Sequence, residues 1–153
     1  MAWIWLAALM ALGACSRSSR EQSMPAIKLP TLAGGSAQSL KSCPTAKCLT
    51  VVVAPWCPYC RAATAKITEL RNFLKKRNIV SKVVVGTDKP QAVLDYAREF
   101  GADTLLDFEG SFAVQGVPHF IVTDSAGSVI KDVPGMPQID DVKELASYFG
   151  LMP

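Results

Sequence analysis

The chain has 153 residues and a formal net charge of +3, and half of its residues are apolar. This length and composition predict one folded domain that is large enough to bury a hydrophobic core. The dense basic run "LRNFLKKRN" (residues 70–78) lacks an aromatic or glycine-rich pattern. It is typical of a solvated helix face, so we do not expect nucleic-acid binding.

The N-terminal stretch, residues 1–14, is uncharged and mostly apolar. It has the length of a signal-peptide core and is shorter than the roughly 20 apolar residues that span a bilayer. It leads into Leu12-Gly13-Ala14-Cys15, which resembles the lipobox of bacterial lipoproteins, whose signal is cut before a cysteine that carries lipid. We therefore expect a signal peptide over residues 1–14 and lipidation of Cys15. No Lys or Arg precedes the apolar core, and the alternative is an uncleaved apolar tail.

The segment after Cys15 is polar and has no hydrophobic periodicity, which is typical of a flexible tether. We expect residues 15–24 to contain the lipidated cysteine and this tether, and residues 25–153 to form the folded domain. A lipid on Cys15 predicts a protein of the bacterial cell envelope that is anchored to a membrane and faces the periplasm.

The first half of the predicted domain changes from strands to a helix. Short apolar pieces around Gly34 and Gly35 predict a small hairpin. Residues 49–54 are a β-branched run without alternation, as in a central strand that is buried on both faces. After Cys57 the apolar spacing becomes that of one helix face, formed by Cys60, Ala63, Ile67, Leu70 and Leu74.

The next predicted elements alternate between strand and helix. Residues 82–86 form a second buried strand, and Pro90 marks the start of a helix that Gly101 ends. A short strand follows within residues 103–108. Such strand–helix–strand units favour parallel pairing of the strands.

The last part of the chain predicts a hairpin and a helix. Residues 120–123 and 128–133 are the two strands of the hairpin, and Asp140 or Asp141 caps a helix that Gly150 follows. The hairpin adds antiparallel strands to the parallel ones. The sequence therefore predicts an α/β fold with a mixed central sheet and helices on both faces.

Two cysteines, Cys57 and Cys60, lie where the buried strand turns into the first helix. The Cys57 sulfur would lie near free backbone N–H groups and the positive end of the helix dipole, and both favour the thiolate. Cys60 begins the apolar stripe and should face inward. An exposed attacking thiolate and a shielded resolving thiol are what thiol–disulfide exchange requires, so we assign these roles to Cys57 and Cys60.

Two stretches, "VVVAPWCPYC" and, further along, "VQGVPHFIVTDSAG", resemble the thioredoxin superfamily. In that family Trp56, Pro58 and Tyr59 would belong to the active-site motif. The resemblance implies that Pro118 is a cis residue whose loop packs against the cysteines, and that Val117 offers backbone groups to a substrate strand. The hairpin and the extra strand and helix within residues 82–106 resemble the TlpA/ResA-like branch of periplasmic oxidoreductases.

This resemblance, from about residue 25 to the end, implies a thioredoxin-like fold with one inserted strand–helix unit and no cofactor. It implies a membrane-tethered thiol–disulfide oxidoreductase that exchanges its disulfide with cysteines of exported proteins, most simply as a reductase. A membrane or periplasmic redox partner would restore the pair. We expect a monomer. An isomerase is less favoured, because isomerases of this fold usually carry a dimerisation domain and this chain has none.

The pattern departs from the family at two positions. Thioredoxin has a buried aspartate where this chain has Val51, and ResA-like proteins have a glutamate where it has Ala63. Without these acids, a disulfide-forming oxidase or an isomerase remains an alternative. The Pro58-Tyr59 dipeptide also occurs in glutaredoxins, but the lipoprotein signal and the longer chain argue against a glutathione enzyme.

His119 is the only histidine of the chain and directly follows Pro118. One interpretation is a solvent-edge residue that begins a strand. A second places it near the sulfurs, where it would tune the Cys57 thiolate. A third makes it a copper ligand together with Cys57 and Cys60, as in a copper-binding thioredoxin-like chaperone.

The second cysteine pair, Cys43 and Cys48, encloses a short loop. Four cysteines beyond Cys15 in an oxidising compartment favour two disulfides, so we expect a structural Cys43–Cys48 bond. An electron relay to Cys57 is an alternative, but Cys48 and Cys57 would lie at opposite ends of the central strand. The spacing does not fit zinc knuckles, and we expect no bound metal.

Overall fold

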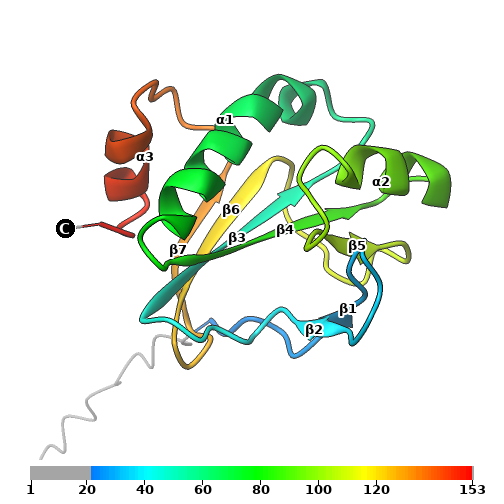
Figure 1. Ribbon diagram of the computed structural model, residues 1–153, viewed down its shortest axis with the longest axis horizontal. Helices are drawn as coiled ribbons and strands as arrows, with labels where there is room; N and C mark the ends of the chain where they lie inside the picture. Colours follow the sequence, from blue (N-terminus) through cyan, green and yellow to red (C-terminus); the bar gives the residue numbers. More distant parts are fainter. Residues whose placement is uncertain (1–21, 153) are drawn as a thin grey trace, which may run out of the picture.

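A computed structural model describes residues 22–152 of the protein. Its five-stranded sheet has the order β5-β4-β3-β6-β7, in which β3 pairs with β4 in parallel and with β6 antiparallel (Figure 1). A separate antiparallel hairpin consists of β1 (Lys28–Leu29) and β2 (Gln38–Ser39). The sheet strands are β3 (Lys47–Val53), β4 (Val80–Gly86), β5 (Leu105–Asp107), β6 (His119–Asp124) and β7 (Val129–Pro134).

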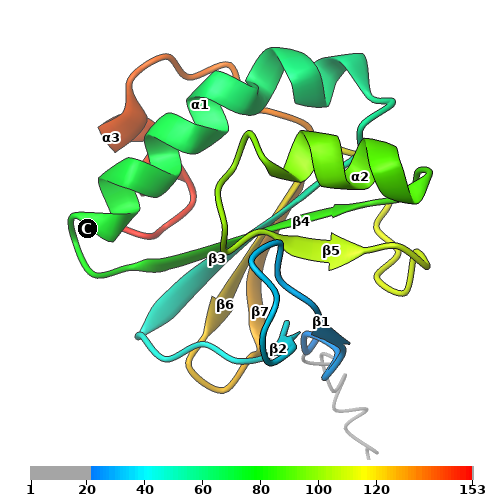
Figure 2. The ribbon, with the colours of Figure 1, turned by 45° about the vertical axis from the view of Figure 1, so that its right-hand side comes forward.

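The three helices cover one face of this sheet (Figures 1 and 2). They are α1 (Pro58–Lys75), α2 (Pro90–Ala97) and α3 (Val142–Tyr148). The predicted mixed sheet is confirmed, but the prediction of helices on both faces is corrected. Helix α1 connects β3 to β4, and α2 connects β4 to β5, so both connections move toward the same edge of the sheet. Because such connections are right-handed, both helices lie on the same face.

The β1–β2 hairpin covers part of the opposite face of the sheet (Figure 2). Leu29 of this hairpin, Met24 and Phe112 share a second hydrophobic cluster with Val52 of β3. Val51 and Val53 of β3 point into the cluster beneath the helices. Apolar side chains of β3 are thus buried on both faces, which confirms the expectation from its unbroken β-branched run.

The predicted signal peptide and Cys15 lie outside the described residues. The folded part begins before the predicted boundary at residue 25, because Met24 is buried and its N–H donates to the Gly127 carbonyl. The Val129 N–H also donates to the Gln22 carbonyl. Within residues 22–152, no helix combines the length and apolar content needed to cross a membrane.

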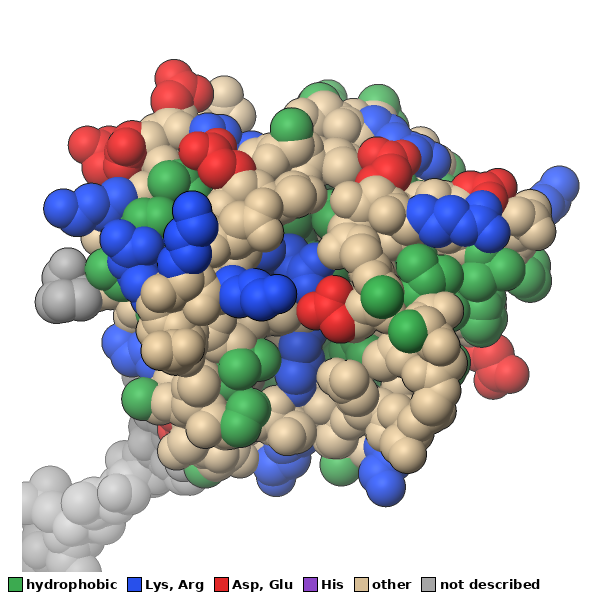
Figure 3. All heavy atoms as spheres, in the orientation of Figure 1, with side chains coloured by type: hydrophobic (Ala, Val, Ile, Leu, Met, Phe, Trp, Pro, Cys, Tyr) green, Lys and Arg blue, Asp and Glu red, His purple; other side chains and the backbone are tan. Residues whose placement is uncertain are grey.

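The basic run on α1 is only partly a solvated face. The Arg71 guanidinium donates to the Phe100 carbonyl and forms an ion pair with Asp103 at 2.7 Å, and its side chain is only 11% exposed. These contacts attach α1 to the loop after α2. On the face shown in Figure 3, Lys and Arg side chains (blue) stand among acidic and apolar ones.

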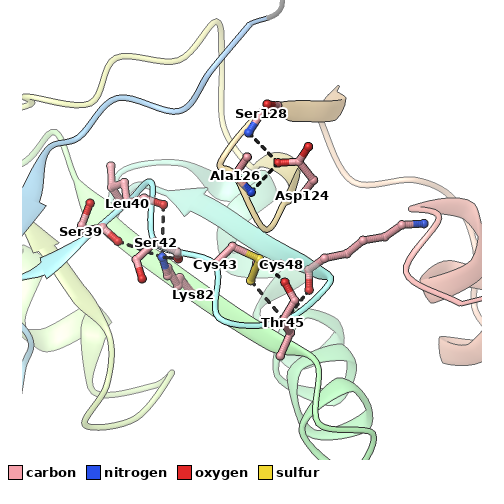
Figure 4. The surroundings of a disulfide bond; sticks show 11 residues. Ser39, Leu40, Ser42, Cys43, Thr45, Cys48, Lys82, Asp124, Ala126 and Ser128 are labelled. Atoms are coloured by element: carbon pink, nitrogen blue, oxygen red, sulfur yellow. Dashed lines mark hydrogen bonds between the residues drawn. A yellow bond between two sulfur atoms is a disulfide. The ribbon is translucent and has the colours of Figure 1, made fainter.

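A disulfide joins Cys43, which precedes β3, to Cys48, the second residue of β3 (Figure 4). Next to it, the buried ammonium of Lys82 on β4 donates to three backbone carbonyls, and burial lowers the pKa of this group below its usual value. The accepting carbonyls belong to Ser39, Leu40 and Ser42. Lys82 and the disulfide together hold the segment after β2 against the sheet.

Removal of this disulfide should destabilise the fold without stopping the chemistry at Cys57. For the Cys43→Ala/Cys48→Ala double variant we expect the free energy of unfolding to fall by about 2 kcal/mol, the chain-entropy value for so short a loop. Urea denaturation followed by circular dichroism measures this change. Equal midpoints for the variant and the oxidised wild type would show that the bond does not stabilise the domain.

Candidate active site

The two cysteines lie at the N-terminal end of α1, directly after β3. Cys57 is the N-cap residue in an extended conformation, and its sulfur accepts the Cys60 N–H at 3.2 Å. Pro58 is the first residue of α1. A backbone N–H at this position has no partner within the helix, so proline loses no hydrogen bond there. The local sequence therefore directs one free helix N–H to the Cys57 sulfur.

The loop before β6 lies against the same sulfur. The Cys57 thiol donates to the Val117 carbonyl at 3.3 Å, and the Val117–Pro118 peptide bond is cis. The Pro118 carbonyl accepts the Gly135 N–H at 2.7 Å, which connects this loop to the end of β7. The structure thus brings together Cys57, Cys60 and the Val117–Pro118 segment, although they are distant in sequence.

Cys60 is shielded as the sequence predicts, but Cys57 is not exposed. Cys57 was expected to be exposed, whereas only 2% of its surface is exposed, because the Val117–Pro118 loop covers it. Cys60 is fully buried in the cluster beneath the helices. Burial, followed by the hydrogen bond with Cys57, raises the pKa of the Cys60 thiol to about 12. Cys60 is therefore a shielded thiol that resists ionisation.

Two exposed aromatic side chains are sequence neighbours of the cysteines. Trp56 is 61% exposed and its indole N–H donates to the Thr87 carbonyl at 2.9 Å, while Tyr59 is 76% exposed. A hollow of about 480 Å³ next to the pair is lined by Tyr59, Val117 and Met136, among others. The site therefore has an apolar rim that a peptide chain could contact.

The charged neighbour of the pair, Arg61, makes its contacts with groups other than the sulfurs. Its Nε donates to the Pro55 carbonyl, its terminal nitrogen pairs with Glu99 at 2.7 Å, and its guanidinium lies 3.9 Å from the centre of the Tyr96 ring. Its charge has only a small lowering effect on the pKa of Cys60. Backbone groups, rather than Arg61, are thus the hydrogen-bond partners of the Cys57 sulfur.

The positions where relatives carry acids are apolar and buried. Val51 and Ala63 both belong to the cluster that contains Cys57 and Cys60. Neither position therefore offers a side chain that could accept the proton of Cys60.

The structure corrects the interpretations of His119. It is buried, not at a solvent edge, and its ring lies on the hairpin side of the sheet, because its register partner is Val52 of the second cluster. The ring nitrogens contact the Gly116 carbonyl and the Asp132 carboxylate, not the sulfurs. Cys57, Cys60 and His119 are thus not brought together, and residues 22–152 contain no cluster of three or more potential metal ligands.

Sequence reasoning did not identify Asp132 as a partner of His119. Asp132 is paired with Ile121 in the β6–β7 register, so it is a diagonal neighbour of His119 on the same face. The alternation of side chains along the predicted hairpin could have shown this relation once the register was known. The predicted strands alone did not fix the register.

A mixed sheet with a Cys-x-x-Cys pair at a helix start, beside a cis-proline loop, defines a thiol–disulfide oxidoreductase of the thioredoxin-like class. A family model described as Redoxin matches residues 19–146, so the chain belongs to the Redoxin family. A search of curated proteins finds no significant match.

Three solved structures with the same fold share 17% to 20% sequence identity with the chain. A putative thiol:disulfide interchange protein DsbE from Chlorobium tepidum has a TM-score of 0.67 at 20% identity, covering 86% of this chain and 94% of its own. An exposed lipoprotein thioredoxin from Streptococcus pneumoniae has a TM-score of 0.65 at 17% identity, covering 82% and 98%. The thioredoxin domain of a Bacteroides vulgatus oxidoreductase has a TM-score of 0.65 at 19% identity, covering 84% and 96%.

Proposed function

We propose that the protein is a membrane-tethered reductase that transfers electrons from the Cys57–Cys60 pair to disulfides of exported proteins. The observation that carries this proposal is the unequal environment of the two sulfurs. Cys57 lies at the helix start between the Cys60 N–H and the Val117 carbonyl, whereas Cys60 is enclosed by the core. This arrangement supports Cys57 as the attacking and Cys60 as the resolving cysteine.

The exchange would proceed in two balanced steps. The Cys57 thiolate attacks one sulfur of the substrate disulfide, forming a mixed disulfide and releasing the other substrate sulfur as a thiolate. The Cys60 thiolate then attacks the Cys57 sulfur, forming the Cys57–Cys60 disulfide and releasing the second substrate thiol. Two electrons pass to the substrate, and a membrane or periplasmic redox partner returns them.

The substrate would be a protein segment in extended conformation. The exposed Trp56 and Tyr59 and the hollow beside Val117 offer apolar contacts on both sides of the sulfur. Once a substrate displaces the Cys57 thiol, the Val117 carbonyl is free to accept a hydrogen bond from the backbone of the bound segment. These contacts favour a polypeptide over a small thiol such as glutathione.

The direction of electron flow is argued from the partners of Cys57. Strongly oxidising pairs have a reduced form that is stabilised through the thiolate, often by a neighbouring cation. Here the hydrogen-bond partners of the Cys57 sulfur are backbone groups, and Arg61 is paired with Glu99. Arg61 is therefore not a hydrogen-bond partner of the sulfur, and the lack of this cationic contact favours a reductase over a strong oxidant.

The tether is proposed from the lipobox at residues 12–15. When the full chain is expressed in a bacterium, we expect it to partition into the detergent phase of a Triton X-114 extraction. The Cys15→Ala variant should be recovered in the aqueous phase or as an unprocessed precursor. Equal partitioning of both proteins would contradict lipidation at Cys15.

The reduction potential of the Cys57–Cys60 pair tests the direction. Equilibration with glutathione or dithiothreitol buffers, followed by alkylation and mass spectrometry, gives this value. A potential near that of thioredoxin, about −270 mV, is expected for a reductase. A potential near about −120 mV would reverse the assignment and indicate a disulfide-forming oxidase.

A further inference from the structure

The ring of His119 is a buried titratable group to which the exchange steps give no role. It is the first residue of β6 and the only histidine in the sequence. Its side chain is 5% exposed and lies on the hairpin side of the sheet, opposite the helices that bury Cys60. Its sequence position directly after Pro118 connects it to the active-site loop.

Both ring nitrogens of His119 face hydrogen-bond acceptors. Nδ1 lies 3.2 Å from the Gly116 carbonyl oxygen, and Nε2 contacts an oxygen of the Asp132 carboxylate. A carbonyl oxygen and an ionised carboxylate can only accept. Both contacts are therefore satisfied only if each ring nitrogen carries a hydrogen, which makes the ring an imidazolium paired with Asp132.

The surroundings provide one countercharge for this ring. A hollow of about 680 Å³ next to His119 and Asp132 is lined otherwise by uncharged residues of the N-terminal segment, the loop before β6 and the two strands. The Asp132 side chain is 41% exposed, so the carboxylate can keep its charge while it holds the ring.

The Gly116 carbonyl belongs to the loop that lies on Cys57. Gly116 has a φ of +133°, a conformation that side-chain-bearing residues avoid, and the next residue is Val117, whose carbonyl accepts the Cys57 thiol. The loop is held at Pro118 by the Gly135 N–H and at Gly116 by the His119 ring. His119 thus restrains the end of the loop that Gly135 does not.

We propose that His119 is a positioning residue, which as an imidazolium held by Asp132 clamps the Gly116 carbonyl and so orients Val117 for the substrate backbone. The part of the inference in which a substrate uses Val117 rests on the proposed function. The charge state of the His119 ring does not depend on that function. The clamp acts on the backbone that recognises a polypeptide, not on the sulfur itself.

The charge state is tested by the ¹⁵N NMR signals of the ring, which are unambiguous because the chain has one histidine. We expect two protonated ring nitrogens in the wild type at neutral pH and the loss of one proton in Asp132→Asn. A singly protonated ring in the wild type would overturn the proposal. This readout remains valid even if the protein proves not to be a reductase.

The positioning role is tested by His119→Phe, which keeps an aromatic ring but removes both donors. We expect kcat/KM for a protein disulfide to fall about tenfold. The rate of Cys57 alkylation by iodoacetamide should not fall with it, because a less restrained Val117 would uncover the sulfur and not shield it. His119→Gln, which restores one N–H donor, should recover part of the exchange rate. Thermal melts of both variants identify any loss of folding.

Two results would contradict this role. Exchange by His119→Phe at the wild-type rate would show that the ring does not orient the loop. An equal fall in alkylation and exchange would show that His119 acts on the thiol and not on the recognition of the substrate.

Discussion

Cys57→Ala should abolish thiol–disulfide exchange, with a loss of at least about a thousandfold in the rate of insulin reduction. The variant lacks the nucleophile, and Cys60 cannot replace it, because Cys60 is fully buried and its pKa is raised to about 12. Cys60→Ala should behave differently. It keeps the attacking sulfur and loses the group that releases the substrate, so it should accumulate mixed disulfides with exported proteins.

Insulin turbidity measures the first effect, and non-reducing gels followed by mass spectrometry measure the second. The matched control is Cys43→Ala/Cys48→Ala, which removes the other two described cysteines and leaves the active pair intact. Full activity of Cys57→Ala, or trapped partners on Cys57→Ala instead of Cys60→Ala, would reverse the roles of the two sulfurs.

Resolution of the mixed disulfide should accelerate steeply with pH. Only the thiolate of Cys60 attacks, and burial is the largest cause that raises the pKa of this thiol to about 12. We expect this burial to persist when Cys57 is bonded to a substrate, because Cys60 lies in the cluster beneath the helices. Below the pKa the thiolate fraction rises tenfold per pH unit, so the rate should rise about a thousandfold between about pH 6 and about pH 9.

Stopped-flow mixing with a peptide disulfide, acid quenching and chromatography give the decay rate of the mixed disulfide. Cys60→Ala is the control and should show no pH-dependent decay. If the rate instead levels off near pH 9.0, the ordinary pKa of a thiol, the burial of Cys60 does not control this step.

Local patterns in the sequence were sufficient for much of the site. The helix stripe from Cys60 to Leu74 predicted which face of α1 is buried, and all five residues of that stripe are buried in the structure. The unbroken run in β3 predicted a central strand, and its place between β4 and β6 confirms this. Such features depend on neighbours within a few residues, which periodicity reports.

Features that depend on distant contacts were not predicted from local patterns. The family resemblance placed the Val117–Pro118 loop against the cysteines, but it did not predict that Val117, sixty residues after Cys57, would leave that sulfur buried. The placement of the helices on one face follows from the order of the strands, and the contact between His119 and Asp132 follows from the β6–β7 register. None of these three relations leaves a periodic signal in the sequence.

The strand β3 separates the two cysteine pairs, since Cys48 lies near its start and Cys57 follows its end. A folded molecule therefore cannot pass electrons from one of its pairs to the other by direct contact of the sulfurs. If electrons do pass between the two cysteine pairs in a solution of the purified protein, they must pass from one molecule to another. The initial rate would then be second order and rise with the square of the protein concentration, which a dilution series would reveal.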